Sequence, residues 1–176
     1  MKKNQMLIFD VASLKESSTG ASLSFSFEGP AEFAEFKLKS DLKGRIDIMK
    51  IDDGFLVRVY DLESTLPTKC EKCLKPLTVP LKIRSFDRQF FLRQPSETED
   101  IYDTFMVNSK NMTIDITELL RQEIILHFPP KIVCSPHCKG ICSHCGVDRN
   151  KKQCDCRDEN PDQDSKPLAV LKDLIK

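Results

Sequence analysis

The stretch GRIDIMKIDDGFLVRVYDLES, residues 44–64, contains two extended runs separated by Asp52, Asp53 and Gly54. Isoleucines at positions 46, 48 and 51 lead into this break, and the run FLVRVY resumes an extended pattern after it. An Asp-Gly pair between two such runs favours a tight β-hairpin, because glycine adopts a positive φ without strain. The stretch therefore predicts two neighbouring antiparallel strands.

Further strands are expected on both sides of this hairpin. Residues 23–27 alternate apolar side chains with serines, which is the period of a half-buried strand. Residues 77–84 alternate in the same way, with threonine, proline, lysine and arginine on the second face. Because Pro80 has no N–H for a ladder hydrogen bond, this segment is predicted to be an edge strand with a basic outer face.

The helix signal lies in NMTIDITELLRQEIILHFPP, residues 111–130. Asp115 can cap a helix, and Glu118 follows at the spacing of a capping box. Positions 116, 119, 120, 123 and 124 then give a mostly apolar face, and Pro129 and Pro130 end the helix. Since strands precede the helix, we predict an α+β fold: a mainly antiparallel β-sheet with one amphipathic helix and a C-terminal cysteine-rich zinc-binding segment.

The chain of 176 residues is expected to have three regions. These are an α+β core over residues 1–130 that carries a C-x-x-C knuckle, a cysteine-rich zinc-binding segment over residues 131–156, and a polar tail with a short terminal helix over residues 157–176. No apolar run approaches the roughly 18 residues that a membrane span requires, and the apolar patch near the N-terminus is too short for a signal peptide. These features predict a cytoplasmic protein without membrane contact, in which clustered cysteines indicate metal or redox chemistry more than disulfides.

Six of the eight cysteines lie within CSPHCKGICSHCGVDRNKKQCDC, residues 134–156. A C-x-x-C pair suits a tetrahedral zinc ion, because a tight turn brings both sulfurs to one ion. The glycine that follows the pair in CSHCG eases this turn, and the CDC motif supplies a second pair of thiols. We predict one closed four-thiolate site formed by Cys142, Cys145, Cys154 and Cys156.

The remaining cysteines make a second set of four. Cys134 and Cys138 lie upstream of the first set, and Cys70 and Cys73 form another C-x-x-C far earlier in the chain. If these four share an ion, it would clip the segment after the helix to the sheet and stabilise the fold. Other partitions stay open: one uses His137, and another joins Cys138 with Cys142 and leaves other thiols free. The count of thiols predicts two structural Zn²⁺ ions.

Catalysis is not expected at such sites. Four sulfurs leave a zinc ion without an open coordination position and make it a poor Lewis acid. The sequence also contains no H-E-x-x-H motif, no Gly-rich phosphate loop and no serine nucleophile elbow. We therefore predict a protein that is not an enzyme and has no small-molecule substrate. Because zinc-bound thiolates can be oxidised and release the ion, a thiol redox sensor is one alternative function.

Both cysteine-bearing segments lie in basic stretches of a chain whose formal net charge is zero. Residues 69–93 contain seven basic and two acidic side chains, and residues 131–152 contain five basic and one acidic. Charge runs are usually solvated faces, but two basic patches also suit an anionic partner. The candidates for contact with RNA phosphates are Lys69, Lys72, Lys75, Lys82, Arg84, Arg88, Lys139, Arg149, Lys151 and Lys152.

Several motifs, taken in order, resemble a known family. They are C-x-x-C-L at residues 70–74, IDITEL at residues 114–119, CKGICSHCG at residues 138–146 and CDC at residues 154–156. This combination is similar to the YceD-like family, the large ribosomal RNA subunit accumulation proteins of bacteria and plastids. The chain departs from the pattern after Gly146, where we expect Gly-x-Asn-Leu-Asn: Arg149 replaces the leucine and Asn150 is kept.

The resemblance implies a role in the synthesis, processing or stability of 23S ribosomal RNA. We predict that the protein acts in this role by binding the RNA or a large-subunit precursor. The chain has no tryptophan and two tyrosines, so contact with the RNA backbone or its shape is expected rather than base stacking. The alternative is a zinc-stabilised interaction module that docks a ribosomal protein or an assembly factor, which the neutral net charge suits. RNA binding should weaken steeply with salt, whereas an apolar docking contact should not.

Overall fold

The computed structural model describes residues 4–93 and 104–156, which belong to two compact units. Unit 1 comprises Met1–Lys69 and Lys75–Ile132, and unit 2 comprises Cys70–Leu74 and the chain from Val133 onward. The knuckle cysteines, which we expected within the core region, therefore group with the cysteine-rich segment. The predicted tail with its terminal helix, residues 157–176, lies outside the described residues.

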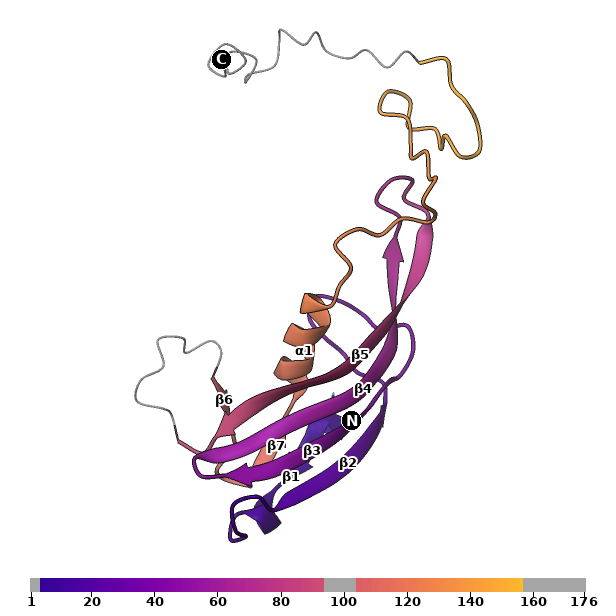
Figure 1. Ribbon diagram of the computed structural model, residues 1–176. Helices are drawn as coiled ribbons and strands as arrows, with labels where there is room; N and C mark the ends of the chain where they lie inside the picture. Colours follow the sequence, from indigo (N-terminus) through magenta and orange to yellow (C-terminus); the bar gives the residue numbers. More distant parts are fainter. Residues whose placement is uncertain (1–3, 94–103, 157–176) are drawn as a thin grey trace, which may run out of the picture. The chain divides into compact units, whose positions relative to one another are not determined.

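All the helices and strands of the described residues belong to unit 1 (Figure 1). In chain order they are η1 (Gln5–Leu7), β1 (Ile8–Asp10), η2 (Ala12–Leu14), β2 (Ser22–Gly29), β3 (Leu42–Ile51), β4 (Gly54–Lys69), β5 (Pro76–Phe91), β6 (Phe105–Met106), β7 (Thr113–Asp115) and α1 (Thr117–Leu126). Strands precede α1, which is the α+β class predicted from the sequence.

The main sheet has the strand order β2-β3-β4-β5-β6, and β1 pairs with β7 in a small second sheet. Neighbouring strands are antiparallel except for β6, which pairs in parallel with Phe90 and Phe91 at the end of β5. Around Pro80 the described chain places no strand on the outer edge of β5, as the sequence predicts. The parallel strand β6 is an addition that the sequence did not indicate.

The predicted hairpin connects β3 and β4, with Asp52 and Asp53 as the two turn residues and Ile51 paired to Gly54. The predicted role of Gly54 is wrong, because none of these three turn positions has a positive φ. A Cβ atom on Gly54 would lie 2.0 Å from the carbonyl oxygen of Phe90 on β5. Glycine is required here because two backbones approach closely, rather than because the turn is left-handed.

Helix α1 begins two residues after the predicted cap and buries the predicted face. Asp115 Oδ1 accepts a hydrogen bond from the Thr117 N–H at 2.8 Å, which satisfies one of the donors at the helix start. Glu118 does not complete a capping box, since its carboxylate binds the Arg121 guanidinium at 2.6–2.7 Å. The residues that face the core are Ile116, Leu119, Leu120, Glu123 and Ile124.

The hydrophobic core of unit 1 lies against one face of the main sheet. Helix α1 and the β1–β7 sheet cover this face (Figure 1). The Phe9 ring of β1 packs on Phe25 and Phe27 of β2, with ring centroids 5.3 and 6.2 Å apart. Apolar residues of β3 and β4 complete the layer, including Ile46, Ile48, Phe55, Val57 and Val59, which are fully buried. None of the residues in this core cluster is a cysteine, so the thiol groups do not contribute to the hydrophobic core of unit 1.

Candidate metal centres

Unit 2 brings all eight cysteines together in two sets of four. One set, here the knuckle site, consists of Cys70, Cys73, Cys134 and Cys138; the other, the tail site, consists of Cys142, Cys145, Cys154 and Cys156. Within each set all four sulfurs lie within 4.8 Å of one another. This is the partition that the sequence spacing predicts. Neither set includes His137, and Cys138 and Cys142 belong to different sets, so the rival partitions do not match the structure.

The geometry of the knuckle site suits a tetrahedral ion. The Sγ atoms of Cys70 and Cys138 are 3.8 Å apart, and those of Cys73 and Cys134 are 3.6 Å apart. Sulfurs bound tetrahedrally to zinc at about 2.3 Å are separated by about 3.8 Å. A disulfide would need about 2.05 Å, and all eight cysteines are free thiols. The structure therefore presents four sulfurs at the spacing of metal ligands.

The backbone around the knuckle site stabilises negative charge on sulfur. The Cys134 N–H donates to Cys70 Sγ at 3.3 Å. Burial raises the pKa of the Cys70 thiol, but the N–H groups of Cys73, Cys134 and Lys72 together outweigh it and bring the pKa to about 6. The neighbouring sulfurs of Cys138 and Cys73 raise the pKa of Cys134 to about 12. Four clustered thiols ionise together only if a cation neutralises them, which a divalent metal would do.

The tail site repeats this arrangement around a C-x-x-C turn. The Cys142 N–H donates to the Val147 carbonyl at 2.9 Å, and the Gly146 N–H donates to the Cys142 carbonyl at 3.0 Å. The N–H groups of Cys145 and His144 are the main cause that lowers the pKa of Cys142 to about 6. Hydrogen bonding with the Cys145 sulfur is the main cause that raises the pKa of Cys156 to about 12. Both sites therefore combine stabilised thiolates with thiols that need a cation to ionise.

The residue after the second cysteine of each C-x-x-C turn is left-handed. Gly146 has φ +71°, as the sequence predicts for a glycine in this place. Leu74 occupies the corresponding position in the knuckle and has φ +59°. A left-handed conformation costs a non-glycine residue about 1–2 kcal/mol, and the Leu74 side chain is 56% exposed. The knuckle turn is thus held in a strained conformation by the structure around it.

The ten cationic residues predicted to contact RNA fall into three groups. Lys82 is 3.4 Å from a carboxylate oxygen of Glu63, and Arg88 is 3.0 Å from one of Glu123. Lys72 Nζ donates to the Cys138 carbonyl at 3.2 Å, and an Arg149 Nη donates to Cys142 Sγ at 3.8 Å. The other six are exposed, and none of them is in an ion pair formed within residues 4–93 and 104–156: Lys69, Lys75, Arg84, Lys139, Lys151 and Lys152.

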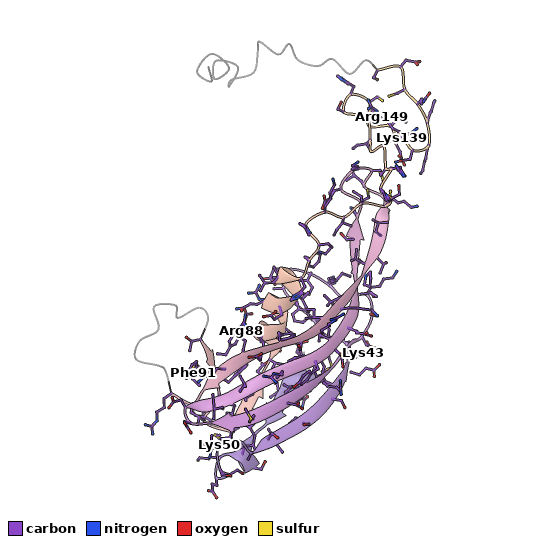
Figure 2. All side chains as sticks on the ribbon, in the orientation of Figure 1. Lys43, Lys50, Arg88, Phe91, Lys139 and Arg149 are labelled. Carbon is purple, nitrogen blue, oxygen red and sulfur yellow. The ribbon has the colours of Figure 1, made fainter. Side chains whose placement is uncertain are left out.

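Lys139 and Arg149 lie close together in unit 2 (Figure 2). The Arg149 N–H donates to the Gly140 carbonyl at 2.9 Å, and the Lys139 N–H donates to Asn150 Oδ1 at 2.9 Å. Arg149 and Asn150 each donate a hydrogen bond to a cysteine sulfur, which the spacing of cysteines in the sequence did not predict. The retained asparagine in the family pattern was the available signal for Asn150.

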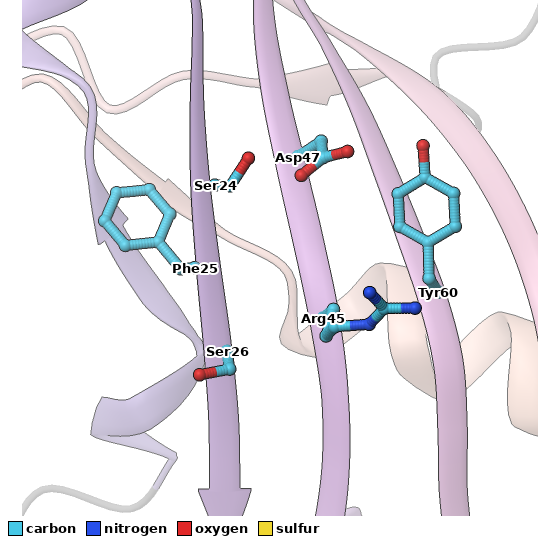
Figure 3. A pocket seen from close by; sticks show the side chains of 6 residues that line it. All are labelled: Ser24, Phe25, Ser26, Arg45, Asp47 and Tyr60. Carbon is cyan, nitrogen blue, oxygen red and sulfur yellow. The ribbon is translucent and has the colours of Figure 1, made fainter.

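An open hollow of about 420 Å³ lies on the outer face of the main sheet (Figure 3). It is lined by Ser24, Ser26, Arg45, Asp47 and Tyr60, with Phe25 at its edge. The Phe25 ring points away from Tyr60 and packs on Phe9 instead. The Arg45 guanidinium is paired with Asp61 of β4. The hollow therefore offers a paired cation and surface hydroxyls.

Within residues 4–93 and 104–156, no helix has the length and apolar character needed to span a membrane.

Comparison with known proteins gives one family. The profile described as "Large ribosomal RNA subunit accumulation protein YceD" matches residues 60–175. A large ribosomal RNA subunit accumulation protein YCED homolog 1, chloroplastic, from Arabidopsis thaliana is 37% identical over 63 residues, which cover 36% of this chain and 20% of that protein. The uncharacterized protein YlbN of Bacillus subtilis (strain 168) is 31% identical over 163 residues, 87% of this chain and 89% of that protein. No solved structure matches the chain significantly.

Proposed function

Since the chain belongs to the YceD family of large ribosomal RNA subunit accumulation proteins, we propose that it promotes the accumulation of 23S ribosomal RNA. It does so as a non-enzymatic factor that contacts the RNA, or a large-subunit precursor particle, through its backbone phosphates. Two structural Zn²⁺ ions hold unit 2 in shape for this contact. The observation that carries the proposal is a loop, placed between two sets of four clustered cysteines, that exposes Lys139, Lys151 and Lys152 outside the ion pairs of the described chain.

Zinc fits the donor set of both sites. Closed sets of four cysteine thiolates are typical of structural zinc, and metal ligation can replace a hydrophobic core in a short segment. The described part of unit 2 contains turns and one isolated bridge, between Ile141 and Asp148, but no helix or strand. The positions of its lysines therefore depend on the cysteines: Lys139 follows Cys138 directly, and the pair at 151 and 152 lies just before Cys154.

The charge of unit 2 limits how many phosphates it can hold. Four thiolates and one Zn²⁺ carry a formal charge of −2, so two such sites carry −4. Lys72 and Arg149 offset part of this charge, because each donates a hydrogen bond to a cysteine of the sites. Among the described residues of unit 2, three exposed lysines remain to contact phosphates. Lys69, Lys75 and Arg84 supply further exposed cations on the β4–β5 hairpin of unit 1.

Residues 70–74 and 133–156 contain no aromatic ring of phenylalanine, tyrosine or tryptophan. The described part of unit 2 consequently offers bases only the imidazoles of His137 and His144 and the Arg149 guanidinium to stack on, so we expect its contacts to be mainly with phosphate and sugar. Such contacts supply affinity with little sequence preference. Selection of 23S ribosomal RNA then requires recognition of the RNA shape or of a neighbouring protein.

The test is UV crosslinking of the tagged protein in growing cells, followed by sequencing of the attached RNA. We expect crosslinks concentrated on 23S ribosomal RNA or its precursor, reduced at least tenfold in a Lys139→Gln, Lys151→Gln, Lys152→Gln variant. The control replaces three exposed lysines of unit 1, at positions 15, 37 and 110, by glutamine. Equal crosslinking by the two variants would overturn the role of the three lysines. A functional tagged protein without 23S crosslinks would overturn direct RNA contact.

A docking module for a ribosomal protein or assembly factor is the second candidate. It is favoured by two exposed apolar side chains of unit 2, Leu74 at 56% and Ile141 at 40%. The salt dependence of binding distinguishes RNA contact from protein docking. If unit 2 makes three phosphate contacts, raising the salt concentration from 50 to 200 mM should weaken its binding to RNA about 20- to 40-fold. Binding to precursor particles that is steady with salt, but lost on Leu74→Ser and Ile141→Ser, would favour docking instead.

A further inference from the structure

The turn at residues 148–150 contacts one cysteine of each metal site. Asn150 Nδ2 donates to Cys138 Sγ of the knuckle site at 3.5 Å, and an Arg149 Nη donates to Cys142 Sγ of the tail site at 3.8 Å. Adjacent residues thus donate hydrogen bonds to one cysteine of each set. Hydrogen bonds to the sulfurs of a metal site disperse their negative charge and orient them.

Asn150 is fixed by three further hydrogen bonds, two of its side-chain amide and one of its backbone N–H. Its Oδ1 accepts from the Lys139 N–H at 2.9 Å, next to the ligand Cys138. Asp148 Oδ1 accepts from both the Asn150 N–H at 2.9 Å and Asn150 Nδ2 at 2.7 Å. The orientation of the side chain therefore follows from the fold of the loop between Cys145 and Cys154, which are ligands of the tail site.

The spacer between Cys138 and Cys142 is also bound from two sides. The Ile141 N–H donates to the Lys72 carbonyl of the knuckle turn at 3.0 Å, and the Arg149 N–H donates to the Gly140 carbonyl at 2.9 Å. Gly140 has φ +76°, and a Cβ atom there would lie 3.1 Å from the Lys72 carbonyl oxygen. The spacer thus keeps one conformation only while both neighbouring segments are in place.

We propose that the two metal sites bind their ions cooperatively, with Asn150 as the positioning residue that links them. An ion in the tail site orders the loop that carries Asn150, and the ordered amide then donates to the Cys138 thiolate. By linkage, an ion in the knuckle site favours the tail site by the same factor. The proposal rests on both cysteine sets being metal sites and does not depend on RNA binding.

The first test is native mass spectrometry of the metal-free reduced full chain after addition of one equivalent of Zn²⁺. Cooperative sites give mainly chains with no ion or with two ions. Independent equal sites give about half of the chains with one ion, and independent unequal sites give mostly singly loaded chains. Either of the last two distributions would overturn the coupling. Saturation below two ions per chain would instead overturn the metal assignment itself.

Two variants of Asn150 test its side-chain contacts. Asn150→Ala removes all three of them, whereas Asn150→Asp keeps an oxygen for the Lys139 N–H and replaces the donor to Cys138 and Asp148 by a carboxylate oxygen. We expect singly loaded chains to accumulate with both, and each variant to lose about 10- to 100-fold in affinity for the knuckle ion. Gln153→Ala, which changes an exposed amide of the same loop, should behave as the wild type. If the Asn150→Asp chain bound zinc with the same distribution of zero, one and two ions as the wild type, Asn150 would not couple the two sites.

The second test measures tail-site affinity alone, by competition with a chromophoric chelator and by the thiolate charge-transfer absorbance of bound Co²⁺. In a Cys70→Ser, Cys73→Ser background the tail site should bind its ion about 5- to 150-fold more weakly than in the intact chain, which is the usual range of coupling. Asn150→Ala should then have no further effect on the tail site. An equal effect of Asn150→Ala in both backgrounds would show that the residue acts only locally, and would overturn the coupling.

Discussion

The Arg88 guanidinium lies 3.0 Å from Oε1 of Glu123, so the buried carboxylate of α1 is paired with a cation from β5. Only 6% of the Glu123 side chain is exposed, against 44% for Arg88. Removing one partner of such a pair is costly, because it leaves the other charge in an environment that solvates it poorly. This pair therefore fixes α1 on the sheet at a defined position.

We predict that Arg88→Met destabilises unit 1 by about 2–4 kcal/mol, since Glu123 then lacks its cationic partner. Adding Glu123→Leu in the same chain should recover most of the loss, because an apolar pair of similar volume suits the interface. Urea unfolding followed by far-UV circular dichroism measures both effects. If the double variant is as unstable as Arg88→Met alone, an unpaired carboxylate is not the cause.

The second prediction concerns Gly54, where β4 begins beside β5. Gly54→Ala should destabilise unit 1 by more than about 2 kcal/mol, because the new Cβ would lie 2.0 Å from the Phe90 carbonyl oxygen and would push the strands apart. Asp53→Ala changes an exposed turn residue next to it and should shift the urea midpoint little. Similar midpoints for the two variants would show that the strands separate without cost.

The sequence predicts those features whose signal lies within one short segment. The alternation in β2, β3 and β4, the apolar face of α1 and the four cysteines of the tail site are of this kind. The knuckle site joins two segments that are far apart in the chain, and it is predicted from the number of cysteines that remain. Strands β1, β6 and β7 have two or three residues each, too few to show a period of two. The role of Gly54 and the contacts of Asn150 depend on segments far away in the sequence, which no local pattern reports.

Arg88 faces the core although the alternation at the start of β5 would place it on the outer face, because the pairing of β4 with β5 is irregular at Asp61. Alternation along β5 places even positions on the outer face, as at Lys82. On β4, Asp61 has φ +49°, close to a register shift between β3 and β4 and opposite the middle of β5. Beyond this point Phe86 pairs with Val59 and Arg88 pairs with Val57, so even positions face the core. The sequence contains no glycine there that would have indicated the irregularity.

The third prediction compares the two left-handed positions at the metal turns. Leu74→Gly should relieve about 1 kcal/mol of backbone strain and so tighten metal binding at the knuckle site about fivefold. Gly146→Ala should weaken the tail site by a similar factor, because no atom lies within 4 Å of the new Cβ and only its φ of +71° is unfavourable. Competition with a chelator measures both changes. Weaker metal binding by Leu74→Gly would mean that the leucine side chain supports the site.

The fourth prediction is a pH effect at the start of α1. The hydrogen bond from Arg121 is the main cause that lowers the pKa of Glu118. A carboxylate whose folded pKa is depressed stabilises the protein above its unfolded pKa near 4.3 and loses this contribution as the pH falls through the folded pKa. Glu118→Gln should therefore lower stability at pH 7 and approach the wild type below about pH 4. Glu16→Gln, at an exposed glutamate, serves as the control; a difference that persists at low pH would exclude this carboxylate as the cause.

The fifth prediction separates the two units by removal of metal. The core cluster of unit 1 contains no cysteine, and every helix and strand of the described chain belongs to that unit. Treatment with a strong chelator should therefore leave the far-UV circular dichroism nearly unchanged, while limited proteolysis begins to cut within residues 134–156. Cys142→Ser should reduce the zinc content by about one ion per chain before any chelation, since it opens the tail site. Loss of the sheet signal together with the metal would show that unit 1 depends on the sites for its fold, and unchanged zinc content in Cys142→Ser would overturn the assignment of that ligand.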